Sequence, residues 1–265
     1  MDSGNKMKFD FKDGNGPVPA HRHVKGGGWV ADTARVEDTA YISSEARVYG
    51  KARIGGYAMI YENAKVYGNA LVLDRAKIHG KAKVYDTSWV YGTTNVYDYA
   101  EICGKAEIYG SARVYNKAKI HGTVEIYDYA EICGKAEIYG SARVYNEAKI
   151  HGNVEIYGNA MIYDEAKVYD SAKICGNARV YGNAKVYGSP LISEDAKIYE
   201  KAKIFGDVQI YGDTRIYGEV KVYDNVWIFG NVLICGDACI SGKTMIYSKA
   251  EVCEKETNNS ENQSK

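Results

Sequence analysis

Hydrophobic positions along this chain recur with a period of six. From Val30 to Val252 every sixth residue is Val or Ile, which makes 38 consecutive hexapeptides without an insertion or deletion. A typical unit is V-Y-G-N-A-K, at residues 180–185. β-branched side chains suit an extended chain. An α-helix needs a period of 3.6 and is disfavoured by a Gly or Asp in every unit. The pattern therefore predicts a repeat of short strands.

Each place in the unit has its own residue type. We number the places from the Val or Ile, which is place one. Place five is mostly Ala and points to the same side as the next place one, because side chains alternate along a strand. Place six is mostly Lys, Arg or Glu, place two is mostly Tyr, and both point to the other side. Place three is Gly, Asp, Asn, Glu or Ser, types that suit a corner. Each unit is predicted to form a strand of about four residues and a corner of two.

Three such units close one triangular coil. The 38 units then make about 12–13 coils. With neighbouring strands about 4.8 Å apart, the rod is on the order of 60 Å long. The predicted fold class is all-β, a single-stranded parallel β-helix with a thin core of Val, Ile and Ala.

The units resemble the hexapeptide repeat of the left-handed β-helix family, which includes many acyltransferases. The likeness is to the long A-[KR]-V-Y-G-N type, and it covers residues 30–254. It implies left-handed coils. It also implies an alternative function, an acetyl-coenzyme A-dependent acyltransferase that acts as a homotrimer with a His as general base. The chain departs from the family at place two, where it has Tyr and the family often has Gly, Ala, Glu or Asp.

The pattern divides the chain into three parts. Residues 1–29 are predicted to be an irregular cap, in which Phe9, Phe11 and Trp29 cover the open end of the first coil. Residues 30–254 form the solenoid. Residues 255–265, KETNNSENQSK, are predicted to be a disordered polar tail.

Charge and cysteine content limit the partners and the compartment. Acidic and basic residues balance at 34 each, which gives no signal for a membrane or a specific nucleic acid. No apolar run is long enough for a targeting or spanning segment, so we expect a cytoplasmic protein. The six Cys are then expected to be free thiols. Cys235 and Cys253 are separated by three whole units, so they should be neighbours on adjacent coils and able to form a bridge on oxidation.

Candidate catalytic or metal-binding residues are few. The solenoid histidines, His79, His121 and His151, all occupy place two and are read as substitutes for Tyr. His21 and His23 have no third ligand in view, so no metal is predicted and their role is left open between capping and a loop hydrogen bond. No catalytic residue is assigned.

A tandem duplication argues against chemistry in the middle of the rod. Residues 97–126 and 127–156 match at 28 of 30 positions. Five units are not a multiple of three, so Cys103 and its copy Cys133 are predicted to lie on different sides of the triangle, as are His121 and His151. This part of the rod is interpreted as adding length to the solenoid and not as a site of chemistry.

Two outward rows are the candidate binding surfaces. One side carries an unbroken row of eight tyrosines, predicted to be a partner face: Tyr91, Tyr109, Tyr127, Tyr145, Tyr163, Tyr181, Tyr199 and Tyr217. Another carries a basic stripe suited to a glycan or other polyanion: Lys149, Lys167, Lys185, Lys203 and Lys221. The leading hypothesis is a non-enzymatic scaffold or binding rod that forms a homo-oligomer and needs no cofactor. Acetyl-coenzyme A is expected only if the acyltransferase alternative holds.

Overall fold

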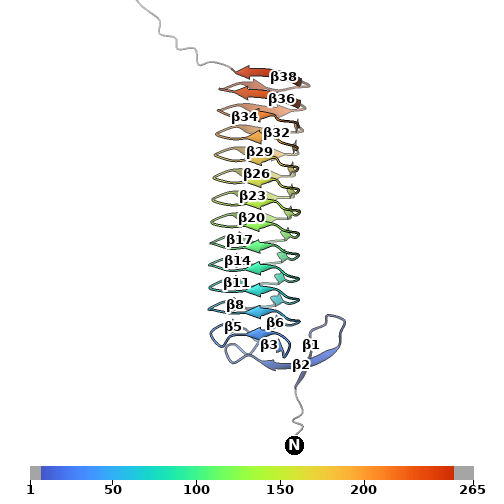
Figure 1. The fold of residues 1–265 in the computed structure, drawn as a ribbon, viewed down its shortest axis with the longest axis vertical. Helices are drawn as coiled ribbons and strands as arrows, with labels where there is room; N and C mark the ends of the chain where they lie inside the picture. Colours follow the sequence, from blue (N-terminus) through green and yellow to red (C-terminus); the bar gives the residue numbers. More distant parts are fainter. Residues whose placement is uncertain (1–6, 254–265) are drawn as a thin grey trace, which may run out of the picture.

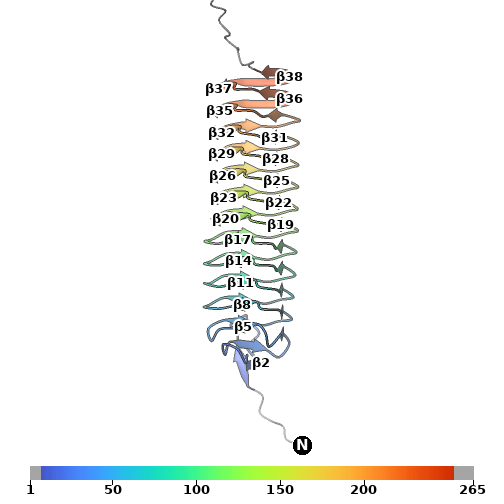
Figure 2. The same ribbon diagram turned by 90° about the vertical axis from the view of Figure 1, so that its left-hand side faces the viewer.

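The chain is a stack of triangular coils along one axis, as the computed structural model shows (Figures 1 and 2). The structure describes residues 7–253. Within that range every regular element is a β-strand, and no helix is present. The same range contains no helix that is long and apolar enough to cross a membrane. The predicted fold class, an all-β parallel β-helix, is confirmed.

The strands fall on three faces. The lysine face is a 12-stranded parallel sheet made of β5 (Tyr41–Ile42), β8 (Met59–Ile60), β11 (Lys77–Ile78), β14 (Asn95–Val96), β17 (Arg113–Val114), β20 (Glu131–Gly134), β23 (Lys149–Gly152), β26 (Lys167–Asp170), β29 (Lys185–Gly188), β32 (Lys203–Gly206), β35 (Lys221–Asp224) and β37 (Cys239–Ile240). The tyrosine face contains β4 (Arg35–Val36), β7 (Arg53–Ile54), β10 (Leu71–Val72), β13 (Trp89–Val90), β16 (Glu107–Ile108), β19 (Glu125–Ile126), β22 (Arg143–Val144), β25 (Met161–Ile162), β28 (Arg179–Val180), β31 (Lys197–Ile198) and β34 (Arg215–Ile216).

The third face contains β3 (Trp29–Ala31), β6 (Arg47–Val48), β9 (Lys65–Val66), β12 (Lys83–Val84), β15 (Glu101–Ile102), β18 (Lys119–Ile120), β21 (Glu137–Ile138), β24 (Glu155–Ile156), β27 (Lys173–Ile174), β30 (Leu191–Ile192) and β33 (Gln209–Ile210). Two long strands, β36 (Trp227–Cys235) and β38 (Met245–Cys253), run from the third face onto the tyrosine face. They join these two faces into one sheet.

Most strands are two residues long, shorter than the four predicted from the sequence. Only six strands of the lysine face have four residues. The chain bends at nearly every corner, yet hydrogen bonds between coils continue around it. In one coil the amides of Tyr91, Thr93 and Asn95 donate to carbonyl oxygens of the next coil, at 3.0, 2.7 and 2.9 Å. Every second amide is thus bonded to the next coil, and the coils are held in an exact register of three units.

Places one and five fill the core. Ile108, Val180 and Ile216 are fully buried, as the sequence predicted. Ser88 and Thr94 occupy place five and are also buried. Each of these hydroxyls donates to the carbonyl oxygen three residues earlier, at 2.7 and 2.6 Å, so no polar group is left unpaired there.

Place three forms the corners with a positive φ. Gly92, Gly110 and Gly182 have φ of 77°, 71° and 67°, which confirms the predicted corners. A Cβ atom on Gly110 would lie 2.7 Å from the backbone nitrogen of the next coil, so a side chain there would displace that corner. Where place three is acidic, its carboxylate often accepts a hydrogen bond from the corner amide of the following coil. One such bond joins Asp164 to the Gly182 amide at 3.1 Å.

The N-terminal segment is more regular than the sequence suggested. β1 (Lys8–Asp10) and β2 (Pro17–Arg22) form an antiparallel hairpin, and β2 pairs antiparallel with β3. The predicted position of the aromatic cap is wrong. Phe9 stacks on Trp29 at 4.3 Å and Phe11 stacks on Tyr49 at 4.9 Å, on the outer side of the third face. The backbone of the hairpin covers the edge of β3. Its Phe11 ring extends the stack of Tyr49, Tyr67 and Tyr85 on the third face.

The last two coils contain a covalent link. Cys235 and Cys253 lie on adjacent strands with Cα atoms 4.6 Å apart, which confirms the predicted proximity. Their sulfur atoms form a disulfide, so the expectation of free thiols is wrong for this pair. The other four cysteines are free. The tail predicted at residues 255–265 lies outside the described residues.

Candidate lysine groove and tyrosine face

The five lysines of the basic stripe lie on consecutive strands of the lysine face. Lys149 pairs in register with Lys167, Lys167 with Lys185, Lys185 with Lys203, and Lys203 with Lys221. All occupy place six and point outward, because the residue that follows each is a buried Val or Ile. We call this set the lysine row. Like charges directly opposite on neighbouring strands destabilise a sheet, so the row is maintained at a cost to stability.

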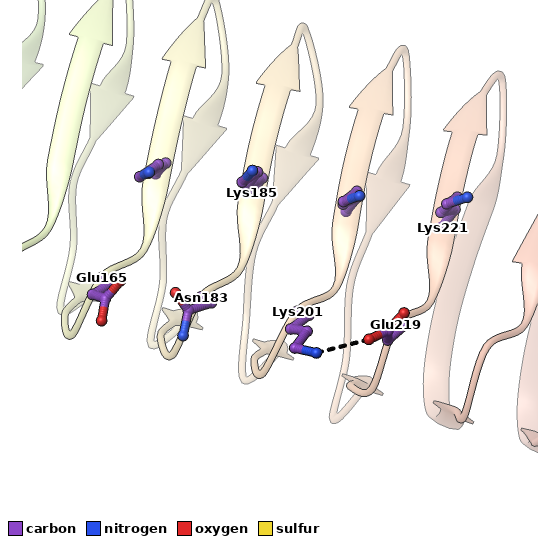
Figure 3. A pocket seen from close by; sticks show the side chains of 8 residues that line it. Glu165, Asn183, Lys185, Lys201, Glu219 and Lys221 are labelled. Carbon is purple, nitrogen blue, oxygen red and sulfur yellow. Dashed lines mark hydrogen bonds and ion pairs between the residues drawn. The ribbon is translucent and has the colours of Figure 1, made fainter.

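A shallow groove runs beside the lysine row. It has a volume of about 500 Å³, and four coils contribute to it. Its floor carries the row from Lys167 to Lys221, and its other wall consists of the corner residues at place four. Figure 3 shows these corner residues in a second row parallel to the lysines: Glu165, Asn183, Lys201 and Glu219.

The groove has an excess of positive charge. Lys201 and Glu219 form an ion pair across one coil boundary, with Nζ and Oε1 2.8 Å apart. This hydrogen bond raises the pKa of Lys201, and the same bond, aided by Lys203 and Lys221, lowers the pKa of Glu219. Neither change affects the charges near neutral pH. Five lysines face two glutamates in the groove, which leaves three positive charges in excess.

Ion pairs are rare at place six of the lysine face. Among residues 7–253, none of the five lysines of the row has a carboxylate within ion-pair distance. On the third face, Lys83 contacts Glu101 at 2.7 Å and Lys173 contacts Glu155 at 3.1 Å, whereas Lys65 and Lys119 have no ion pair within the same range. The lysine row is therefore distinguished by its length, five lysines on consecutive strands.

Aromatic residues lie beside the lysine row at place two. Tyr187, Phe205 and Tyr223 stack with centroids 4.9 and 4.8 Å apart and planes within 2°. The ring faces between these three residues are therefore covered and offer no platform for a nucleobase. Tyr169, beside Lys167, differs, because it meets His151 edge to face with centroids 6.4 Å apart.

A second shallow groove continues the same corner toward the N-terminus. It has a volume of about 540 Å³, and its charges balance, because its lining residues are Ser111, Arg113, Tyr129, Glu131, Glu147 and Lys149. Tyr129 is 69% exposed, unlike the stacked tyrosines of the faces. The two grooves together follow one edge of the rod.

The eight predicted tyrosines form a continuous ladder on the tyrosine face. Neighbouring ring centroids are 4.7–5.0 Å apart, and the planes deviate by 2–4° except for 13° between Tyr199 and Tyr217. All eight are half-buried. Burial raises the pKa of Tyr109 and of Tyr163 to about 12, so the hydroxyls stay protonated at neutral pH. The structure brings the predicted residues together as one flat row.

The solenoid histidines lie within the aromatic rows. His79 stacks between Tyr61 and Tyr97 at 4.5 and 5.0 Å. His121 lies on the third face, whereas His151 lies on the lysine face, where it is paired in register with Cys133. The different faces predicted for the duplicated residues are confirmed.

The two N-terminal histidines have separate partners. His21 contacts Asp32, with Nδ1 and Oδ1 3.0 Å apart, and His23 is buried with Nδ1 3.2 Å from the Lys25 carbonyl oxygen. Within residues 7–253 no three His, Cys, Asp or Glu side chains are placed to hold a metal ion.

The sequence reasoning missed the wall of the groove. Glu165, Asn183, Lys201 and Glu219 differ in type, so no row of identical residues marks them. Only their position could have identified them as a wall of the groove. All four occupy place four of successive coils, two residues before a lysine of the row. Corner carboxylates such as Asp164 were also interpreted only as turn formers. A Gly at the same place of the next coil, such as Gly182, is the signal for a hydrogen bond from its amide to the carboxylate.

The fold and the repeat define the chain as a hexapeptide-repeat β-solenoid. A family model described as the YdcK β-solenoid repeat matches residues 172–189, the length of one coil. No curated protein gives a match.

Solved structures with similarity to the chain include two acyltransferases. The UDP-N-acetylglucosamine O-acyltransferase (LpxA) from Moraxella catarrhalis RH4 has 15% identity and a TM-score of 0.49, with 62% of this chain and 70% of that chain covered. LpxA from Acinetobacter baumannii has 14% identity and a TM-score of 0.30, with 60% and 71% covered. Similarity at this level transfers no activity to the chain.

Proposed function

We propose that the chain is a non-enzymatic scaffold that binds partners along its outer faces, and that an extended acidic polysaccharide binds in the lysine groove. The observation that carries this proposal is the lysine row: five cations in register on consecutive coils, without ion-pair partners among the described residues. A linear ligand with regularly spaced carboxylates offers each lysine a counter-charge and relieves the repulsion along the row.

The surroundings of the row favour a glycan over a single-stranded nucleic acid. Binding of single strands depends on aromatic faces on which bases stack. Beside Lys185, Lys203 and Lys221 the faces between neighbouring rings are covered by stacking. Polar corner residues such as Asn183 and Lys201 line the opposite wall and are suited to sugar hydroxyls. Tyr129 supplies one open ring at the end of the edge.

The test compares binding of polygalacturonate, neutral dextran and single-stranded DNA by calorimetry. The key variant replaces Lys167, Lys185, Lys203 and Lys221 by Gln. Exposed charge pairs contribute about 0.2–1 kcal/mol each, so four lost contacts are worth about 1–4 kcal/mol. That corresponds to a loss of affinity of about fivefold to several hundredfold. The interaction should also weaken as salt rises, because the groove is open to solvent.

A matched control replaces by Gln four lysines that line neither this groove nor the similar one beside Lys65 and Lys83: Lys105, Lys119, Lys135 and Lys173. This variant has the same net charge, and we expect less than about twofold loss of affinity, because distant charges are screened. Equal losses in the two variants, or equal binding of dextran, would refute a specific lysine groove. Tighter binding of DNA than of polygalacturonate would refute the ligand class. A saturable thermal shift with acetyl-coenzyme A would instead favour the acyltransferase alternative.

A further inference from the structure

The tyrosine face carries a second outward row beside the tyrosines, at place six. Its residues lie on consecutive strands, one per coil. In chain order the row contains Arg35, Arg53, Leu71, Trp89, Glu107, Glu125, Arg143, Met161, Arg179, Lys197, Arg215, Leu233 and Glu251. We call it the charged row.

The charged row is complementary to its own reverse. When the row is turned end for end about the midpoint between Arg143 and Met161, six kinds of pair form and Arg35 is left without a counterpart. They are Arg53 with Glu251, Leu71 with Leu233, Trp89 with Arg215, Glu107 with Lys197, Glu125 with Arg179, and Arg143 with Met161. Three are opposite charges, one is apolar, one is a cation beside an aromatic ring, and the sixth, next to the axis, places Arg143 beside Met161. None joins like charges.

The tyrosine ladder has the same centre. Its eight rings run from Tyr91 to Tyr217, so its midpoint lies between Tyr145 and Tyr163. These residues belong to the same two coils as Arg143 and Met161. Two neighbouring rows are therefore symmetric about one point on the face.

A two-fold axis through that point, parallel to the strands, brings each row against its own reverse. We propose that a second copy of this chain packs antiparallel on the tyrosine face and forms an isologous dimer. In this dimer Tyr145 of one copy faces Tyr163 of the other, and every ladder tyrosine meets a tyrosine. Tyrosine is favoured at such interfaces, because it gives a large contact area with little loss of side-chain entropy.

The charges select this register over its neighbours. A slip of one coil in one direction places Arg143 opposite Arg179 and Leu71 opposite Glu251. A slip in the other direction places Arg143 opposite its own copy and Leu71 opposite Arg215. Both alternatives oppose like charges, which the proposed register does not, and this specifies against them.

The face has the shape and the unpaired charges that this packing needs. The ring planes stay within 4° from Tyr91 to Tyr199, so the face is nearly untwisted over these coils. Within residues 7–253, Glu107 and Arg179 have no ion-pair partner, and each meets an opposite charge in the dimer. Their counterparts Lys197 and Glu125 each have one ion pair in the single chain, with Asp213 at 4.0 Å and with Arg143 at 3.3 Å. Trp89 is 47% exposed in the single chain and is covered by the second copy.

A charge-swap experiment tests the dimer. One variant carries Glu107→Lys and Glu125→Arg, and the other carries Arg179→Glu and Lys197→Glu. Each alone opposes like charges at four sites, so we expect light scattering to give a monomer mass for each and a dimer mass for the wild type. The two variants mixed together restore every charge pair, so the mixture should form a heterodimer. Circular dichroism confirms that both variants remain folded.

Carbodiimide cross-linking maps the register. We expect a link between Glu107 and Lys197 in the wild type. The two residues are five coils apart within one chain, roughly 24 Å, so such a link must join two copies. A monomeric or trimeric wild type, variants that still dimerise alone, or a mixture that stays monomeric would each overturn the proposal. Polygalacturonate binding is unaffected by this outcome, because the lysine groove lies on a different face.

Discussion

Ile108 gives a direct measure of what one core position contributes to this rod. Its side chain is fully buried at place one of β16, between Val90 and Ile126 on the adjacent strands. Replacement by Ala removes three carbon atoms, worth about 2.4 kcal/mol at about 0.8 kcal/mol per buried methylene.

The cavity adds to this loss. The strands on both sides of Ile108 are fixed by hydrogen bonds in every coil, so the surroundings collapse only partly around the smaller side chain. We therefore expect Ile108→Ala to lower the free energy of unfolding by about 2–5 kcal/mol. Ile108→Val is the matched control, with an expected loss of about 0.5–1.5 kcal/mol.

Urea unfolding followed by circular dichroism measures both variants against the wild type. The midpoint should fall in the order wild type, Ile108→Val, Ile108→Ala, with little change in slope. A loss below about 0.5 kcal/mol for the Ala variant is typical of a surface position. That result would contradict the place of Ile108 in the core and the inward direction of place one.

Three further predictions concern the last coils, the corners and the tyrosines. Thiol titration of the unfolded, unreduced protein should find four of the six cysteines, and a count of six would contradict the bridge between Cys235 and Cys253. Asp164→Ala removes the acceptor of both the Gly182 amide and the Asn146 side-chain amide, so urea unfolding should show a loss of about 1–3 kcal/mol, and an unchanged midpoint would contradict it. Tyr109 has its pKa raised from 10.0 to about 12, so its contribution to stability is complete below pH 10 and is lost as the pH rises through about 12. Absorbance titration of phenolate in the wild type and in Tyr109→Phe checks this, and a difference curve centred at pH 10 would contradict the effect of burial.

Much of this molecule follows from side-chain alternation and an unbroken period of six. Place one had to point inward, because a Val or Ile recurs there without exception, and the row from Val30 to Ile240, buried except at the partly exposed Val36, confirms it. The same period placed the tyrosines and the lysines in rows, since three units per coil put equivalent residues of every third unit on adjacent strands. Left-handed winding was implied only by the resemblance, because the period is the same for either hand.

Features without an exact repeat required the tertiary structure. The N-terminal hairpin could not be placed from residues 1–29, because its contacts with β3 and with Tyr49 depend on long-range packing. The strand lengths were overestimated, because the period says where the chain turns but not how sharply each corner bends. The groove wall was missed because Glu165, Asn183 and Lys201 share a position and not a residue type.

The sequence alone therefore determined the coil, its core and the identity of each outward row. Local alternation and a constant spacing suffice for these, since both act between residues that are close in the chain or an exact number of repeats apart. Only the tertiary structure decided which rows share an edge, which charges are neutralised and which ring faces are covered. Those properties depend on the distance between side chains of different coils and faces, and distance in space is what a one-dimensional pattern does not contain.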